Sequence, residues 1–331
     1  MNNKTTLKHI SERLDLSIST VSRALNGHPD ISLETREKVK QLAAELNYEP
    51  NTYAIGLRTN KSKIFGVIVP EISNFFYHSF IASVEEESRK MGYSVLILQS
   101  GNDQLQETEN IRLCRINRVA GVFIAISGDN IDTVEFEKLE EDEVPVIFFD
   151  KVPPIDACNK VRLADEDAAT LAATLILEKK KMNILAIFGN PGMSITQKRK
   201  QSFTHIINAH PEVTLQTAHA GSPEKAFDIV HELFRNKEYP GVIFSMSDEI
   251  LIGVMKAVQV HRLKVPDEIG IVSISNDGFI PRLYAPEITY IETSGYKLGK
   301  LAFERIRDHM EGKHFYRELI LPAKLIVGKS L

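Results

Sequence analysis

The sequence predicts an α/β protein with an all-α head at its N-terminus and a core of two doubly wound α/β lobes. Two observations lead to this prediction. The first fifty residues contain three short amphipathic helical patterns, and from residue 64 onward apolar runs of strand length alternate with helical stretches. The apolar runs are nearly continuous, as expected of parallel strands that are covered on both faces.

Each expected helix of the head has a recognisable start. The first covers residues 7–14, and the second covers residues 18–25, with Ser17 as its N-cap and Gly27 just past its end. Ser32 caps a longer third helix, in which apolar residues recur three and four positions apart. The turn between the first two helices is short, which indicates a helix-turn-helix arrangement.

A different kind of segment follows the head. Pro50 can open a helix at its first turn, and residues 51–57 have the length of two helical turns. A helix of this length is not stable alone in water. The basic, polar stretch "RTNKSK" after it reads as a linker.

The core is expected to contain seven strands and seven helices. The strands are the runs "IFGVIV", "YSVLIL", "VAGVFIAI", "VPVIFF", "NILAIF", "GVIFSM" and "IGIVSI". The helices cover 75–91, 105–117, 132–141, 166–180, 197–209, 223–236 and 248–262. A break near "DKVPPIDACNK" divides the strands four and three, which predicts two lobes with a cleft between them. The domains are 1–50 (head), 51–62 (hinge helix and linker) and 63–331 (core, with an N-lobe of about 63–160 and 293–322 and a C-lobe of about 161–292 and 323–331).

Charge and composition narrow the class of protein. The net charge of −4 conceals a basic head, because residues 1–63 hold ten Lys and Arg against seven Asp and Glu. A basic head on an acidic body is typical of a nucleic-acid-binding module joined to another domain. No long apolar run and no signal-peptide pattern is found, so we expect a cytoplasmic protein without membrane contact. Cys114 and Cys158 are expected to be reduced, structural thiols.

Motifs of catalysis are missing from the sequence. It contains no Gly-rich phosphate loop and no GxSxG turn, and His231-Glu232 lacks the second His of a zinc motif. The acidic run at 165–167 is expected at a helix end, where solvated or capping carboxylates are usual. We therefore expect no enzyme activity, no cofactor and no metal.

Side chains that can bind a partner are instead concentrated in the stretch "LSISTVSRALNG", residues 16–27, which contains several Ser and Thr hydroxyls and one Arg. In a helix-turn-helix, the second helix enters the major groove of DNA. Short Ser and Thr side chains there can donate to phosphate oxygens, and the guanidinium of Arg23 can pair with both acceptors of a guanine.

These residues also carry a resemblance. The head "TLKHISERLDLSISTVSRALNGHPDISLETREKVKQLAAELNYEPN" and the core stretches "GVIVPEISNFFY" and "VSISNDGFIPRLYAPEIT" resemble the LacI/GalR family of bacterial repressors. The resemblance extends over essentially the whole chain. It implies a homodimer, with a tetramer left open, that binds double-stranded operator DNA and is regulated by a small effector.

The resemblance assigns roles to individual positions of the head. Bases are read by Ile18, Ser19 and Arg23, phosphates are held by Thr6, Ser17, Thr20, Ser22 and Asn26, and Leu57 is the hinge leucine that wedges into the minor groove. His9 stands where many members of the family have Asp, so the capping of the first helix is expected to differ.

The core is similar to periplasmic sugar-binding proteins, in which the ligand lies between two lobes. Polar and aromatic side chains at the carboxyl ends of the strands are the expected ligand contacts. They are Phe75, Phe76, Asp150, Lys151, Arg199, Asp248, Asn276 and Asp277, of which Arg199 matches an effector-binding Arg of the family. Of the two phenylalanines we expect one to face the cleft, and Asp248 is also a natural helix N-terminal residue.

Departures from the family pattern leave the effector open. Ser275, Ser247 and Thr293 stand where the family often has Asp, Asn and Gln, so a phosphosugar, an oligosaccharide product or a sugar acid are alternatives to a common hexoside. The sequence predicts a transcriptional regulator, expected to be a repressor, controlled by a sugar-derived effector. Control by a protein partner, or sugar binding without a regulatory role, are the alternatives.

Overall fold

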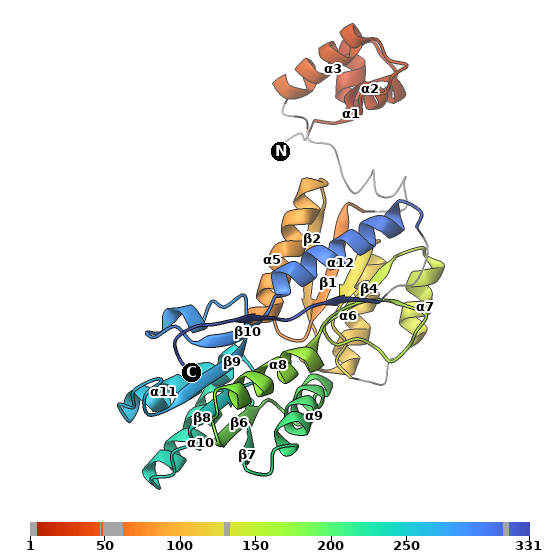
Figure 1. Cartoon of the computed structure of the whole chain (residues 1–331). Helices are drawn as coiled ribbons and strands as arrows, with labels where there is room; N and C mark the ends of the chain where they lie inside the picture. The colour runs from red at the N-terminus through yellow and green to blue at the C-terminus, as the bar shows by residue number, and fades with distance from the viewer. Residues whose placement is uncertain (1–4, 47, 49–61, 129–132, 314–317) are drawn as a thin grey trace. The chain divides into compact units, whose positions relative to one another are not determined.

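The structure is a computed structural model that describes residues 5–46, 48, 62–128, 133–313 and 318–331. The chain divides into two compact units, Met1–Ser62 and Lys63–Leu331. Both units are drawn in Figure 1. The predicted hinge helix, with Leu57, lies outside the described residues.

Three helices form the first unit: α1 (Leu7–Leu14), α2 (Ile18–Leu25) and α3 (Leu33–Glu45). The bounds of α1 and α2 coincide with the prediction. The helices enclose a small apolar core of Ile10, Val21, Ala24, Val39 and Ala43. Because one side of α2 supplies two of these five residues, its opposite side is left for other contacts.

The first lobe of the second unit is built on a parallel sheet with the strand order β11-β5-β4-β3-β1-β2. Its strands are β1 (Ile64–Val69), β2 (Ser94–Gln99), β3 (Gly121–Ile124), β4 (Val146–Phe149), β5 (Asn159–Leu163) and β11 (Glu318–Leu321), and its helices are α5 (Phe75–Lys90), α6 (Gln104–Ile116), α7 (Thr133–Glu141) and α12 (Gly295–Met310).

Alternate residues of β1 show why both faces of this sheet are apolar. Phe65 and Val67 point into a core shared with α5 and α12, while Ile68 points into a second core shared with α6 and α7. Burial on both faces accounts for the continuous apolar run that predicted this strand.

The second lobe repeats this plan with the strand order β12-β10-β9-β8-β6-β7, in which β12 alone runs antiparallel to its described neighbour. Its elements are α8 (Asp165–Glu178), β6 (Asn183–Phe188), α9 (Ser194–Asn208), β7 (Thr214–His219), α10 (Pro223–Arg235), β8 (Val242–Ser245), α11 (Asp248–Val260), β9 (Gly270–Asn276), the 3-10 turn η1 (Pro281–Leu283), β10 (Thr289–Thr293) and β12 (Lys324–Ile326).

Three short segments join the two lobes within the described chain. They are Ala164, Ser294 and the pair 322–323. The first crossing lies later than the predicted boundary at residue 160, because β5 pairs with β4 and β11 and extends to Leu163. The second lies one residue later than predicted, since Thr293 still pairs with Asn276.

Several elements were not predicted from the sequence: the strands β5, β7, β10, β11 and β12, and the helix α12. Helix α12 lies beside α5 (Figure 1). A Cβ atom at Gly295, the first residue of α12, would lie 2.3 Å from the carbonyl oxygen of Phe76, so this close approach requires glycine. Glycine is a poor helix former, and the requirement of packing here outweighs local propensity.

Candidate functional site

The exposed face of α2 carries the side chains that were predicted to read bases. Val21 and Ala24 on the opposite face are fully buried. Ile18 is 48% exposed. Ser19 and Arg23 are also exposed, and because they are four residues apart they are neighbours on the helix surface. The structure therefore brings Ile18, Ser19 and Arg23 together on a single surface.

Among the predicted phosphate-contacting side chains, several already make local hydrogen bonds. The Ser17 hydroxyl accepts a hydrogen bond from the backbone N–H of Thr20 (3.0 Å) and caps α2. It also lies 2.7 Å from the hydroxyl of Ser19 and 2.8 Å from that of Thr20. The side-chain amide of Asn26 donates to the carbonyl oxygen of Ser22 (2.8 Å) at the other end of the helix. Their binding of phosphate stays a prediction.

Thr6 and His9 form a capping box at the start of α1. The hydroxyl of Thr6 accepts from the backbone N–H of His9 (3.4 Å), and Nδ1 of His9 accepts from the backbone N–H of Thr6 (3.2 Å). The imidazole of His9 thus takes the part that a Glu or Gln side chain usually plays. The departure from the family pattern at this position changes the capping group and leaves the helix start intact.

Asp30 is a head residue that the sequence reasoning missed. One of its carboxylate oxygens lies 2.9 Å from Nη1 of Arg23, and the other lies 2.5 Å from Nδ1 of His28. Slight burial raises the pKa of Asp30, but the hydrogen bond from His28 and the charge of Arg23 outweigh it and hold the pKa below its ordinary value. Arg23, which is predicted to read a base, is thus paired with a carboxylate of the head.

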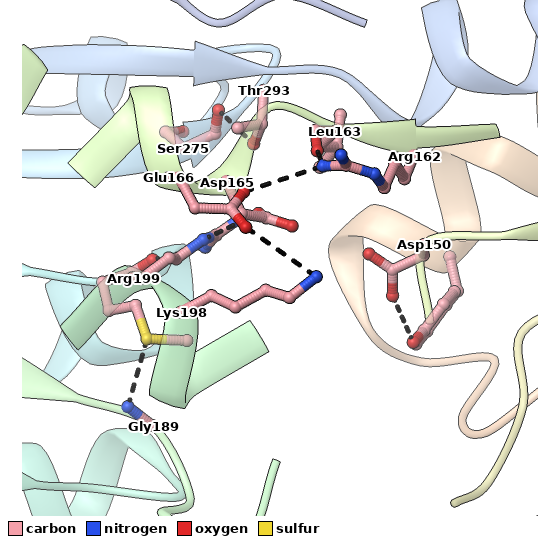
Figure 2. A network of polar contacts seen from close by, with 12 residues as sticks. Asp150, Arg162, Leu163, Asp165, Glu166, Gly189, Lys198, Arg199, Ser275 and Thr293 are labelled. Atoms are coloured by element: carbon pink, nitrogen blue, oxygen red, sulfur yellow. Dashed lines mark hydrogen bonds and ion pairs between the residues drawn. The ribbon is translucent and has the colours of Figure 1, made fainter. Parts of the chain in front are cut away.

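In the core, Phe75 and Asn276, two of the predicted effector residues, make contacts across the two lobes, and Asp150 is held within the first lobe. Asp150 follows β4 in the first lobe, has a left-handed backbone (φ 58°), and accepts a hydrogen bond from the hydroxyl of Tyr77 (2.7 Å). Burial and the nearby carboxylate of Asp165 raise the pKa of Asp150, while Tyr77 and the positive charges of Lys151 and Arg199 oppose this shift. Figure 2 draws Asp150 in one close view with Asp165 and Arg199 of the second lobe.

Arg199 is held by groups of its own lobe (Figure 2). Nε and Nη2 both donate to Oδ1 of Asp165, at 3.0 and 2.7 Å, and Nη1 donates to the carbonyl oxygen of Met246 at 3.0 Å. Both charged side chains are almost fully buried. The sequence reasoning placed Asp165 at a helix end, which is correct, but only the tertiary structure brings it against Arg199.

Lys151, another predicted effector contact, is hydrogen-bonded within the first lobe. Its ammonium donates to the side-chain oxygen of Asn102 (2.7 Å) in the first lobe. Burial lowers the pKa of Lys151, and the nearby carboxylates of Asp150 and Glu107 oppose the shift.

Phe75 and Phe76, although adjacent, pack in different lobes. Phe76 packs against the core of the first lobe, whereas Phe75, from the same helix, packs against the core of the second. The side chain of Asn74, which caps this helix, donates to Glu249 of the second lobe (3.1 Å). The first turn of α5 is therefore a contact between the lobes.

Asp248 and Asn276 are occupied by contacts within the protein. The carboxylate of Asp248 is buried and accepts from the hydroxyl of Ser275 (2.5 Å) and the backbone N–H of Asn276 (2.8 Å). The side-chain oxygen of Asn276 accepts from the backbone N–H of Gly295 (2.8 Å), and its amide nitrogen donates to the carbonyl oxygen of Phe75 (3.2 Å). Asn276 thus ties β9 to both α5 and α12.

The three positions that depart from the family pattern support this arrangement. Ser275 bonds to Asp248, Ser247 caps α11, and the hydroxyl of Thr293 donates to the carbonyl oxygen of Ser275 (3.3 Å). Asp277, the next predicted contact, has a left-handed backbone (φ 55°), as Asp150 does. Asp adopts this backbone more readily than most residues.

In the described ranges, no group of three or more His, Cys, Asp and Glu side chains is placed to hold a metal ion. None of the helices in these ranges combines the length and apolar character that a bilayer-spanning segment needs.

Each of the two structural units matches a known protein family. The family described as "Bacterial regulatory proteins, lacI family" matches residues 6–51, and the family "Periplasmic binding protein domain" matches residues 65–314. Together they define a DNA-binding transcriptional regulator with a ligand-binding type of core. The chain belongs to the LacI family of bacterial regulatory proteins.

Individual relatives share the full length. The HTH-type transcriptional regulator KdgR of Bacillus subtilis is 28% identical over 335 residues, which cover 99% of this chain and 98% of the relative. The Lac repressor dimer bound to operator and the anti-inducer ONPF has the same fold (TM-score 0.86, 22% identity, 99% of each chain). The regulator CelR in complex with cellobiose shares the fold with a TM-score of 0.69 (19% identity, 98% of this chain and 99% of that chain). These relatives are regulators rather than enzymes, as the sequence predicted.

The buried carboxylate of Asp248 predicts a pH dependence of stability. Burial raises its pKa to about 7 from an ordinary value of 3.8, although Ser275 and Asn276 oppose the shift. Between these values the native state holds a proton that the unfolded chain has released, so stability from this group is lost as pH rises from about 4 to about 7. Asp248→Asn stays neutral throughout and can keep both contacts, with its oxygen accepting from the backbone N–H of Asn276 and its amide nitrogen donating to the hydroxyl of Ser275.

We expect the free energy of unfolding of Asp248→Asn, relative to the unchanged protein, to increase by about 2–4 kcal/mol between about pH 4 and pH 7.5. Urea denaturation of the full chain at several pH values measures this difference. Asp267→Asn, at an exposed loop position, is the matched control. Parallel pH profiles for the unchanged protein and Asp248→Asn would contradict the assignment.

Proposed function

We propose that this regulator binds operator DNA in the cytoplasm as a homodimer and that a sugar-derived effector bound between the two lobes controls its affinity for DNA. The observation that carries the effector role is a pair of held polar side chains, Asp150 of the first lobe bonded to Tyr77 and Arg199 of the second bonded to Asp165, which Figure 2 draws in one close view. A ligand that contacts side chains of both lobes favours one arrangement of the lobes over another.

DNA recognition is assigned to the exposed face of α2. Ile18 can contact a thymine methyl group, and the guanidinium of Arg23 can donate two hydrogen bonds to a guanine. The hydroxyls of Ser17, Thr20 and Ser22, with Thr6 and Asn26, are proposed to hold phosphates and so to set the position of the helix on the duplex.

This division of roles predicts different effects for two substitutions in α2. Arg23→Ala removes a base contact, so the preference at one base-pair position in each half-site should fall about 5- to 100-fold. Ser22→Ala removes a phosphate contact, so binding should weaken to a similar degree on all sequences. Selection of binding sites from random duplexes measures both. Identical base preferences for Arg23→Ala and the unchanged protein would refute the role of Arg23.

The proposed dimer would bring two hinge segments together at the centre of the operator. Leu57 then wedges into a base step in the minor groove, which bends the duplex and allows more of the protein to contact it. This assignment rests on the resemblance to the family, since Leu57 lies outside the described residues.

Leu57→Ala tests the wedge. We expect operator affinity to fall about tenfold or more, together with the bend angle, because unstacking without an inserted side chain is unfavourable. Gel-shift titration and fluorescence energy transfer across a doubly labelled operator measure the two quantities. Leu171→Ala, an exposed leucine of α8, is the control. Unchanged affinity and unchanged bending would exclude the wedge.

Charge balance favours a neutral, polyhydroxyl effector. The buried cation Arg199 is already paired with the carboxylate of Asp165, and one donor of the Lys151 ammonium is directed at the neutral side chain of Asn102. The guanidinium has five N–H groups, of which Asp165 and Met246 engage three, and Asp150 has acceptor capacity beyond Tyr77. Such groups suit the hydroxyls of a sugar, and CelR, which shares the fold, is known in complex with the sugar cellobiose.

A thermal-shift screen of the full chain against neutral sugars, sugar acids and sugar phosphates tests this proposal. We expect a neutral sugar to raise Tm, and Asp150→Asn to weaken its binding about tenfold, since a hydrogen bond to a charged acceptor is lost. Asp142→Asn, at an exposed position of the same lobe, is the matched control. Equal binding by Asp150→Asn would remove Asp150 from the site. Normal operator binding with no response to any sugar would instead favour control by a protein partner.

A further inference from the structure

The turn after the recognition helix is held in a defined conformation. The backbone N–H of His28 donates to the carbonyl oxygen of Arg23 (3.0 Å), and that of Ile31 donates to the carbonyl oxygen of His28 (3.2 Å). Ile31 packs against the apolar core of the head, and Ser32 caps α3. Nη1 of Arg36 also donates to the carbonyl oxygen of Gly27 (3.3 Å). Asp30 lies between these fixed points, so its position beside α2 is set by the fold of the head.

The carboxylate of Asp30 is shared between two side chains. Its Oδ2 lies 2.9 Å from Nη1 of Arg23, and its Oδ1 lies 2.5 Å from Nδ1 of His28. All three side chains are about half exposed. His28 therefore limits the movement of the carboxylate that in turn limits the movement of Arg23.

A guanidinium has more donors than this contact uses. Asp30 engages Nη1 of Arg23, whereas the N–H groups on Nε and Nη2 also form a flat pair of donors. A guanine needs one such pair for its O6 and N7 atoms. The ion pair with Asp30 is thus compatible with guanine recognition by the same side chain.

We propose that Asp30 is a positioning residue that fixes the Arg23 guanidinium for contact with a base and keeps it from pairing with a phosphate. The proposal rests on the base-reading role given to Arg23 above. A long, flexible arginine at a DNA surface has the phosphate groups as competing partners, and these carry no sequence information. An anchored guanidinium loses less conformational freedom when it meets the base.

The same carboxylate has a cost for binding. A negative charge beside the recognition helix repels the DNA backbone, so it weakens binding to every sequence. Asp30 therefore increases discrimination while it decreases overall affinity. A residue that only supports the fold of the head would not have these two opposite effects.

Four variants of the full chain test the proposal: Asp30→Ala, Asp30→Asn, Arg23→Ala and Glu37→Ala. Glu37, an exposed residue of α3, is the matched control, because its loss changes the charge of the head by the same amount. Each variant is taken through site selection from random duplexes, and its affinity for a random-sequence duplex is measured by fluorescence anisotropy.

We expect Asp30→Ala and Asp30→Asn to reduce the preference at the base-pair position that Arg23→Ala affects, by about three- to tenfold, and to bind random duplex a few times more tightly. Glu37→Ala should leave the base preference unchanged. Circular dichroism melts identify any variant whose head is unfolded. If Asp30→Ala is unfolded, the base preference of the isosteric Asp30→Asn decides whether Asp30 positions Arg23.

The outcomes separate the two proposals. If Arg23→Ala loses the preference but both Asp30 variants keep it, the positioning role is overturned while the role of Arg23 stands. If Arg23→Ala itself keeps the preference, the proposed role of Arg23 fails. A loss of preference spread over all positions in the Asp30 variants would show a structural effect on the head and would also overturn the inference.

Discussion

The side-chain amide of Asn276 is the contact on which the geometry of the core depends. It stands at the end of β9 in the second lobe and bonds to the start of α5 and the start of α12 in the first. The backbone N–H of the same residue donates to Asp248 at the start of α11. One residue thus fixes three helix starts, and Tyr77, which holds Asp150, lies in the first turn of α5. A group with both donors and an acceptor is required here, because each partner lies at a partly buried helix end.

Local sequence signals were sufficient for the head and for most of the core. The bounds of α1 and α2 follow from cap residues and from apolar residues spaced three and four apart, all within a few positions along the chain. Strands buried on both faces have an equally clear local signal. By contrast, β5 and β7 include charged or polar residues, and their strand structure depends on pairing with neighbours that are distant in sequence.

Individual residues of the candidate sites could be proposed from the sequence, but the partners that hold their side chains could not. Arg199 and Asp150 follow from their places after strands and from the resemblance to a family. By contrast, Asp165 is defined by its contact with Arg199, and Asp30 by its contact with Arg23. Asp165 lies 34 residues before Arg199 along the chain. Asp30 looked like an ordinary turn residue, a place where Asp is common for local reasons. Ion-pair partners of this kind become evident only when the chain has folded.

The three crossings between the sheets also have a mechanical consequence. Two of them are single residues and the third is a pair, so each acts as a tether only a few ångströms long. Two bodies joined by three short tethers can tilt about them, but they cannot slide past one another or separate. Relative motion of the lobes is thereby confined to a small set of rotations, and the start of α12, which directly follows the tether at Ser294, lies next to the pivot of these rotations.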